Sequence, residues 1–285
     1  GGATDLIYRG RFAPSPTGPL HMGSLVAALG SFLDARSHEG EWYLRVDDID
    51  PPRHEKASFR SIPLCLERHG LTWDGPIILQ SQRHDAHEDS LSRLRNAGHL
   101  FDCRCTRATL GELGSCVSNC RDRKDIKGSV RFNVPDDAPD LVKDLFLGEQ
   151  RASALPSNFI VKRRDGLIAY QLATAIDDLD EGYTHVIRGA DLLESSLRQM
   201  MLHQTLGRLS PKYGHLPIVT DQSGNKLSKQ TGAQAIDTDT PKANLRRALA
   251  FLGQPTPPHE VDCVEDILKL ATANWRRNAL NSKNM

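Results

Sequence analysis

The sequence lacks a long hydrophobic run: no window of about 18 residues is predominantly apolar, so we expect no membrane-spanning segment. It also lacks a net charge, because 36 lysine and arginine residues balance 36 aspartate and glutamate residues. This balance argues against a protein that coats nucleic acid by charge alone, although local basic patches can still contact RNA. We see no secretory signal, internal repeat or low-complexity segment, and we expect a cytoplasmic protein. The leading Gly1-Gly2 is typical of a processing scar and is left out of the fold argument.

Cysteine is scarce, but four of the six cysteines fall in one short segment. The four are Cys103, Cys105, Cys116 and Cys120, whereas Cys65 and Cys263 stand alone. In a chain without a secretion signal, a tight cluster suggests a metal site before a disulfide. Four thiolates at this spacing can close a tetrahedral Zn²⁺ shell, which would leave no open coordination position and would therefore be structural. The alternative is four reduced thiols in a loop.

Helical and strand-like patterns alternate over the first hundred residues. Apolar periodicity predicts strands over 6–12, 41–46 and 77–79 and helices over 23–38, 55–69 and 84–97. Such alternation argues for an α/β fold with a parallel sheet wrapped by crossover helices.

The pattern changes at about residue 101. Residues 101–157 carry the cysteine cluster, are rich in Asp, Gly and Pro, and are expected to form an irregular insertion. Regular structure resumes with two strand-like runs around the turn Arg164-Asp165-Gly166, which places Tyr170 on a strand. Further along we expect a helix over 192–206, a strand at 216–219 and helices over 242–252 and 261–275. The chain therefore divides into 1–100, 101–157, 158–230 and 231–285.

The stretch RFAPSPTGPLHMGS, residues 11–24, is an unusual turn between a strand and a helix. In open parallel sheets ligands bind beyond the carboxyl ends of the strands, and a helix N-terminus favours an anion. His21 is expected two residues ahead of the helix, where it could donate a hydrogen bond to a phosphoryl oxygen, and Gly23 lets the backbone approach a ligand. A capping or packing histidine is the alternative.

A second candidate phosphate-binding segment is KLSKQ, residues 226–230, in a loop that follows a strand. Two lysines on a mobile loop can hold a polyphosphate as point charges. This signal is weak alone, because exposed lysines are common in loops, but the two segments in this order around a parallel sheet are far more specific.

HMGS resembles the HIGH signature of class I aminoacyl-tRNA synthetases, and KLSKQ resembles their KMSKS loop. RFAPSPTGPLHMGS, RVDDIDPPR, QSQR and VIRGADLL are similar to glutamyl-tRNA synthetases in particular, over residues 8–252. The resemblance implies a Rossmann-type catalytic core in two halves, 1–100 and 158–230, with a zinc-bearing insertion and a short helical C-terminal region. Only about 55 residues follow Gln230, too few for a large helical anticodon-binding region. We therefore expect a member of the truncated paralogue family, the glutamyl-queuosine tRNA(Asp) synthetases.

Members of that family activate L-glutamate with ATP without needing tRNA and esterify it onto queuosine in the anticodon loop of tRNA(Asp). The resemblance thus implies ATP, glutamate and queuosine-bearing tRNA(Asp) as partners, one structural Zn²⁺, Mg²⁺ accompanying ATP, and a monomer. A shortened glutamyl-tRNA synthetase that charges the tRNA 3′ end is the main alternative. A nucleotidyltransferase of the same superfamily and a zinc-held RNA-binding module are weaker ones, because they leave the amino acid residues or the first turn unexplained.

The resemblance also assigns roles to individual residues. His21 would contact the α-phosphoryl oxygens of ATP beside Gly23, and Lys229, helped by Lys226, would hold the β- and γ-phosphates. The glutamate site would comprise Arg11, Phe12, Ala13, Pro14, Ser15, Asp47, Tyr170 and Arg188.

Asp47 departs from the family pattern. The family usually has Arg-Ile-Glu-Asp where this chain has Arg45-Val46-Asp47-Asp48, so the carboxylate expected to meet the glutamate ammonium is one methylene shorter. Either the backbone lies closer to the substrate or a water fills the gap.

Overall fold

The structure, a computed structural model, describes residues 6–227 and 233–281. Its strands are β1 (Arg9–Phe12), β2 (Glu41–Val46), β3 (Ile78–Leu79), β4 (Leu100–Cys103), β5 (Ser129–Asn133), β6 (Leu141–Asp144), β7 (Gly148–Arg151), β8 (Asn158–Lys162), β9 (His185–Gly189) and β10 (Lys212–Leu216). Its helices are α1 (Met22–Ser37), α2 (Ser58–Arg68), α3 (His84–Asn96), α4 (Tyr170–Asp180), α5 (Leu193–Thr205), α6 (Pro241–Phe251), α7 (Val264–Ala273) and α8 (Asn278–Asn281). The strands and helices predicted before residue 100 all form close to their expected bounds.

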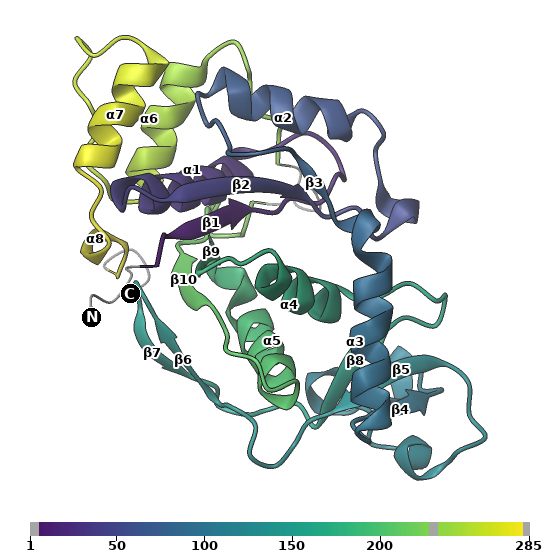
Figure 1. Ribbon diagram of the computed structural model, residues 1–285. Coiled ribbons are helices and arrows are strands. Elements are labelled where there is room, and N and C mark those ends of the chain that lie inside the picture. The colour runs from purple at the N-terminus through teal and green to yellow at the C-terminus, as the bar shows by residue number, and fades with distance from the viewer. Residues whose placement is uncertain (1–5, 228–232, 282–285) are drawn as a thin grey trace.

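Parallel strands form the centre of the molecule (Figure 1). β1 pairs with β2 and β2 with β3, while β9 pairs with β10, and every one of these pairings is parallel. β9 runs beside β1, where the Thr184 backbone N–H donates to the Arg9 carbonyl over 2.9 Å. The predicted α/β fold with a parallel sheet is confirmed, and a strand from before residue 100 adjoins one from after residue 157.

Helices cover both faces of this sheet (Figure 1). α1, α6 and α7 pack on one face in a core that includes Ile187, and α4 and α5 pack on the other in a core that includes Val186. These neighbouring residues of β9 point to opposite faces, as adjacent strand residues do. The crossovers that follow β1 and β9 therefore leave the sheet in opposite directions, which creates a crevice beyond the carboxyl ends of the two strands.

The expectation of an irregular chain over 101–157 was wrong in part. β4, β5 and β8 form an antiparallel sheet, with an irregular register between Val130 and Arg131, and β6 and β7 form a hairpin. The hairpin lies along β10, because the Leu145 backbone N–H donates to the Tyr213 carbonyl over 2.9 Å. All five strands are only four or five residues long, and β4, β5 and β8 pair over large sequence separations, so local periodicity does not reveal them.

Two later elements also differ from the sequence prediction. Tyr170 is the first residue of α4 rather than part of a strand, because the second strand-like run makes only a single bridge, Ile168 to Lys162. The final strand of the sheet ends at Leu216, where a strand over 216–219 was expected. Pro217 lacks the backbone N–H that would extend the ladder.

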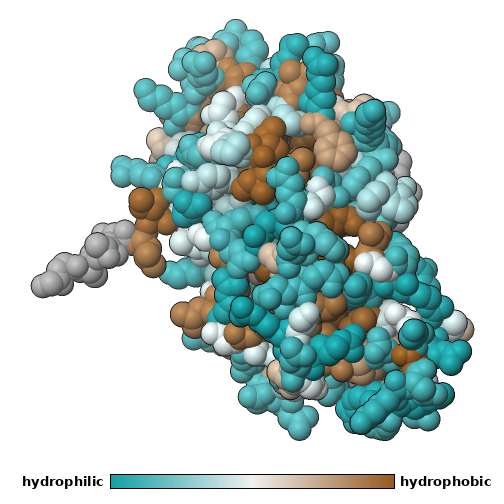
Figure 2. All heavy atoms as spheres, turned by 45° about the vertical axis from the view of Figure 1, so that its right-hand side comes forward, coloured by the Kyte–Doolittle hydropathy of each residue, from teal (hydrophilic) through white to brown (hydrophobic). Residues whose placement is uncertain are grey.

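The face shown in Figure 2 is mostly hydrophilic, and its apolar residues form separate patches. Among the residues that the structure describes, no helix combines the length and the apolar character that crossing a membrane requires.

Asp34 of α1 ties the C-terminal helices to the sheet. Its carboxylate is buried and accepts hydrogen bonds from Tyr8 Oη (2.6 Å), Trp275 Nε1 (2.9 Å) and Arg277 Nε (2.7 Å). Burial alone would raise the pKa of Asp34, but the hydrogen bonds from Arg277 and Tyr8 outweigh it and hold that pKa below its ordinary value.

We expect Asp34→Asn to lower the free energy of unfolding at pH 7 by about 1.5–3 kcal/mol, the usual contribution of hydrogen bonds to a charged group. Because the folded-state pKa is depressed, this contribution is present above the ordinary aspartate pKa of 3.8 and is lost as pH falls through the folded-state value. Denaturant unfolding from pH 7 to pH 3 should therefore show the two proteins converging. The control is Asp89→Asn at an exposed position, whose free energy of unfolding should change by no more than about 0.5 kcal/mol. An equal loss of stability in both variants would contradict the role of Asp34 in holding the C-terminal helices.

Candidate active site and metal centre

A cavity of about 310 Å³ lies beyond the carboxyl ends of β1 and β9. Its walls come from the first turn, from the end of β9 and from the segment that follows β10. Ten of the residues named in the sequence analysis line it: Arg11, Phe12, Ala13, Pro14, Ser15, His21, Gly23, Tyr170, Arg188 and Lys226. The volume is in the range of small-molecule sites, and the position is the crevice where open parallel sheets bind ligands.

Arg188 lines this cavity with a positive charge that has no carboxylate in direct contact among the described residues. Its Nη2 donates to Ser196 Oγ (2.7 Å) and Gln199 Oε1 (3.0 Å), and its Nη1 to Tyr170 Oη (3.3 Å), so every partner is neutral. Its Nε is buried without a hydrogen-bond partner, and no carboxylate among the described residues forms an ion pair with it. A buried, unpaired guanidinium calls for an anionic ligand, and a carboxylate suits its planar fork.

Arg11 also lines the cavity, but its charge is already paired. Its Nε and Nη2 donate to the two oxygens of Asp178 on α4, over 3.0 and 2.8 Å. Burial would raise the pKa of Asp178, yet the charges of Arg11 and Arg45 outweigh it and hold that pKa well below its ordinary value. Arg11 is therefore fixed in place, and no described residue accepts a hydrogen bond from its Nη1.

Among the described residues that the sequence analysis assigned to ATP or glutamate, only Asp47 does not line the cavity. Its Oδ1 accepts from Arg45 Nε over 2.7 Å, and its backbone N–H donates to the Pro14 carbonyl over 2.8 Å. Burial raises the pKa of Asp47 to about 6 despite the Arg45 charge. The residue thus supports the first turn from behind and reaches the cavity only through its neighbours.

His21 caps α1, so it lies one residue ahead of the helix rather than two. Its Nδ1 accepts from the Ser24 backbone N–H over 3.4 Å, which leaves the ring proton on Nε2 as a hydrogen-bond donor. A Cβ at Gly23 would lie 2.9 Å from the imidazole Cε1, so a larger residue there would displace the ring. The capping and the functional interpretations are therefore compatible.

The segment before residue 228 brings Lys226 to the same cavity. Lys226 Nζ lies 2.5 Å from Asp191 Oδ2, just after β9, and the Leu227 backbone N–H donates to the Val219 carbonyl over 2.8 Å. An imidazole from the start of the chain and an ammonium group from residue 226 thus line one cavity. Lys229, the other predicted lysine, lies outside the described residues.

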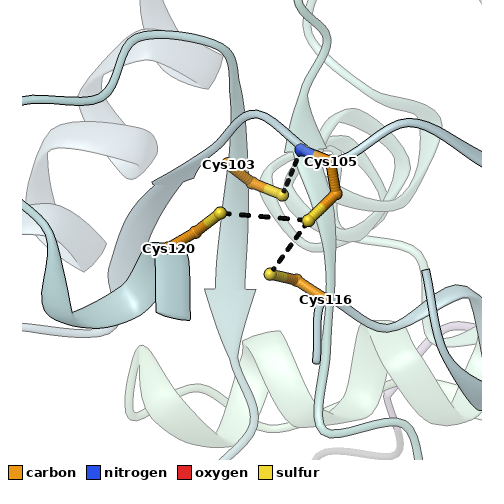
Figure 3. A group of neighbouring side chains, drawn as sticks. All are labelled: Cys103, Cys105, Cys116 and Cys120. Atoms are coloured by element: carbon orange, nitrogen blue, oxygen red, sulfur yellow. Dashed lines mark hydrogen bonds between the residues drawn. The ribbon is translucent and has the colours of Figure 1, made fainter. Parts of the chain in front are cut away.

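The four clustered cysteines meet in space (Figure 3). Their sulfur atoms all lie within 4.8 Å of one another, with Cys105 Sγ 3.5 Å from Cys116 Sγ and 3.9 Å from Cys120 Sγ. Four thiolates at about 2.3 Å from a tetrahedral ion would be roughly 3.8 Å apart. The donor set and the spacing therefore suit one tetrahedral metal ion.

Asn158, the first residue of β8, holds this cluster against the antiparallel sheet. Its Oδ1 accepts from the Cys116 backbone N–H over 2.7 Å and its Nδ2 donates to the Cys116 carbonyl over 2.9 Å. Arg131 Nη1 also donates to Asn158 Oδ1, over 3.2 Å. The cysteine loop is thus fixed by a buried amide that is distant in sequence.

The sequence profile of tRNA synthetases class I (E and Q), catalytic domain, matches residues 8–116 and 114–261. The chain belongs to this family. Two curated relatives are named glutamyl-Q tRNA(Asp) synthetase: one from Vibrio vulnificus (strain YJ016), 40% identical, and one from Escherichia coli (strain K12), 42% identical. Each alignment covers 97% of this chain and 92% of the relative.

The class I synthetase fold is also evident among solved structures. A glutamate tRNA ligase from Elizabethkingia meningosepticum, crystallised with its amino acid, superposes with a TM-score of 0.77 at 24% sequence identity. The match covers 96% of this chain, and this chain spans 65% of that structure. At this identity the likeness shows the fold alone.

In this class I synthetase, several residues that shape the site were missed by the sequence analysis. Asp178 holds Arg11, Asp191 pairs with Lys226, and Asp144 and His215 lie behind Arg188. Asp178 had a weak signal, since it interrupts the apolar face of a helix, but the sequence does not say which cation it meets. Asp144 had none, because its strand was read as irregular chain.

We expect Asn158→Ala to weaken metal binding by the cysteine cluster about 10–100-fold, because it frees the backbone of Cys116. The measurement is competition for Zn²⁺ between the protein and a chelating dye. Asn119→Ala, at an exposed position beside Cys120, is the matched control. Equal affinity in both variants would show that Asn158 does not orient the thiolates.

Proposed function

We propose that the chain acts as a glutamyl-Q tRNA(Asp) synthetase: it activates L-glutamate with ATP in the absence of tRNA and transfers the glutamyl group to queuosine in the anticodon loop of tRNA(Asp). One observation carries the proposal, the meeting of Arg188, His21 and Lys226 in a single cavity. A dicarboxylic amino acid and a triphosphate both need cations, and this cavity supplies them on its two sides. The names of the relatives support this reaction over others in the family.

Glutamate would lie between the first turn and the end of β9. Arg188, free of ion pairs among the described residues, would bind one substrate carboxylate, with the Tyr170 hydroxyl beside it. Arg11 and the first-turn residues Phe12, Ala13, Pro14 and Ser15 would line the rest of the amino acid site. Asp47 would reach the ammonium through a bridging water, since its carboxylate faces Arg45.

ATP would lie over the N-terminus of α1. In the first step an oxygen of the glutamate α-carboxylate attacks the α-phosphorus of ATP, and pyrophosphate leaves. His21 Nε2–H would donate to the α-phosphoryl oxygens as charge builds, and the absence of a side chain at Gly23 leaves room for that ring. Lys226 and Lys229 would hold the β- and γ-phosphates, with Mg²⁺ bound to the nucleotide as a substrate ion.

In the second step a hydroxyl of queuosine attacks the carbonyl carbon of the mixed anhydride, the bond from that carbon to the phosphate oxygen breaks, and AMP leaves with the hydroxyl proton on its phosphate. The cysteine cluster would hold one structural Zn²⁺ in the insertion 101–157 and brace the surface that meets the RNA. The segments 1–100 and 158–230 would form the two halves of the catalytic domain, 231–285 the helical C-terminal region, and the protein would act as a monomer.

Pyrophosphate exchange tests the function directly. We expect glutamate-dependent exchange without tRNA, followed by transfer of labelled glutamate to tRNA(Asp) that carries queuosine but not to the same tRNA without it. The rival function, a shortened glutamyl-tRNA synthetase, predicts labelling of the 3′ end of tRNA(Glu) regardless of queuosine. Loss of the label when the 3′-terminal adenosine is removed before charging would favour the rival and contradict our proposal.

We expect His21→Asn to slow pyrophosphate exchange by about 10²–10³, the usual effect of removing one preorganised donor. Asparagine is a good N-cap, so this variant separates the chemistry from the capping. Its unfolding free energy should stay close to that of the unaltered protein, whereas His21→Ala should lose about 1 kcal/mol. Glutamate binding by calorimetry should survive in both; exchange at the unaltered rate would remove His21 from its assigned role.

A further inference from the structure

Behind Arg188 lies a buried chain of hydrogen-bonding side chains that leads away from the cavity. Arg188 Nη2 donates to Ser196 Oγ over 2.7 Å, and Ser196 Oγ lies 2.8 Å from His215 Nε2. On the far side of the ring, His215 Nδ1 lies 2.5 Å from Asp144 Oδ2. Ser196 and His215 are inaccessible to solvent, and Asp144 is nearly so.

The donors and acceptors in this chain can be assigned from one end to the other. Asp144 Oδ2 accepts, so His215 Nδ1 carries a proton. Burial lowers the pKa of His215 despite Asp144, so the ring is neutral at pH 7 and its Nε2 is an acceptor. The single proton of the Ser196 hydroxyl can go to His215 Nε2 at 2.8 Å or to the Leu192 carbonyl at 3.2 Å. We assign it to the shorter contact, which leaves the oxygen lone pairs facing the Arg188 guanidinium.

The Asp144 charge is balanced without a cation. Its Oδ1 accepts from the backbone N–H groups of Phe146 (2.8 Å) and Leu147 (3.0 Å), and more distantly from that of His215 (3.3 Å). Backbone donors stabilise a buried carboxylate, so His215 need not be protonated. Asp144 thus differs from Asp178, which is balanced by pairing directly with Arg11.

We propose that His215 and Asp144 are positioning residues for glutamate binding: through Ser196 they fix the Arg188 guanidinium while leaving its charge for the substrate carboxylate. A carboxylate in direct contact with Arg188 would orient it equally well but would neutralise it. The neutral His215 imidazole and the Ser196 hydroxyl lie between the Asp144 carboxylate and the Arg188 guanidinium. They orient the guanidinium and keep the two charged groups apart. This inference rests on the proposed function and names the residues that set its amino acid affinity.

We call the chain Asp144–His215–Ser196–Arg188 the relay. Steady-state pyrophosphate exchange with His215→Phe tests it, because phenylalanine fills the space of the ring and offers no hydrogen bond. We expect the KM for glutamate to rise about tenfold or more, as for the loss of a hydrogen bond to a charged group, while the KM for ATP changes less than about twofold. His215→Gln, which can still accept from Ser196, should lie closer to the unaltered protein. Arg188→Ala gives the upper limit of the effect.

The matched control is His203→Phe. His203 is equally buried, lies on α5 and binds Ser210 Oγ (2.7 Å) and the Ala175 carbonyl (2.8 Å), but unlike His215 it makes no hydrogen bond to Ser196. It should lose thermal stability and keep both KM values. Equal glutamate KM in the two phenylalanine variants overturns the relay.

Should His215→Phe fail to fold, Ser196→Ala decides instead, since it removes one hydroxyl: a raised glutamate KM supports the relay and an unchanged one overturns it. An unaltered protein that shows no glutamate-dependent exchange overturns the proposed function and the relay with it. Normal exchange together with an unaffected glutamate KM in the relay variants overturns the relay alone.

Discussion

Asp178 connects the two parts of the chain that build the cavity. From α4, after the insertion, it accepts hydrogen bonds from Arg11 on β1 and Arg45 on β2, both before the insertion. All three side chains are almost fully buried, and leaving such a charge unpaired costs about 3–5 kcal/mol. The contact thus supports the close approach of β1 and β9, and the cavity exists only where these two strands end together.

The cavity separates cations that are already paired from one that is not. Arg11 and Lys226 each have a carboxylate at hand, in Asp178 and Asp191, so their charges are partly balanced before any ligand arrives. Arg188 donates hydrogen bonds only to hydroxyl and amide groups and makes no ion pair among the described residues. Because a buried charge without a counterion is costly, an arriving carboxylate recovers most free energy at Arg188. The proposed selection of an acidic ligand rests on this difference more than on the number of basic groups.

The sequence predicted those parts of the site that lie close together along the chain. The first turn places a strand end, a tight loop and a helix start within fourteen residues. Each of these three parts has a sequence pattern that can be recognised locally, and His21 and Gly23 lie within that stretch. Tyr170 was assigned to the wrong element yet lines the cavity, because the family motif selected it and periodicity alone assigned its local structure. Asp144 and His215 meet across 71 residues, and no local pattern announces a contact of that kind.

The hairpin of β6 and β7 shows that the insertion is not a detachable module. It lies in the same intervening segment as the cysteine cluster, yet its Asp144 supports β10 and the amino acid side of the cavity. A minimal catalytic fragment made by excising the whole segment between the two half-domains would expose the rear of the Arg188 pocket. Engineering that aims to exchange the cysteine-bearing part of the segment should therefore splice on the cysteine side and leave the hairpin with the core.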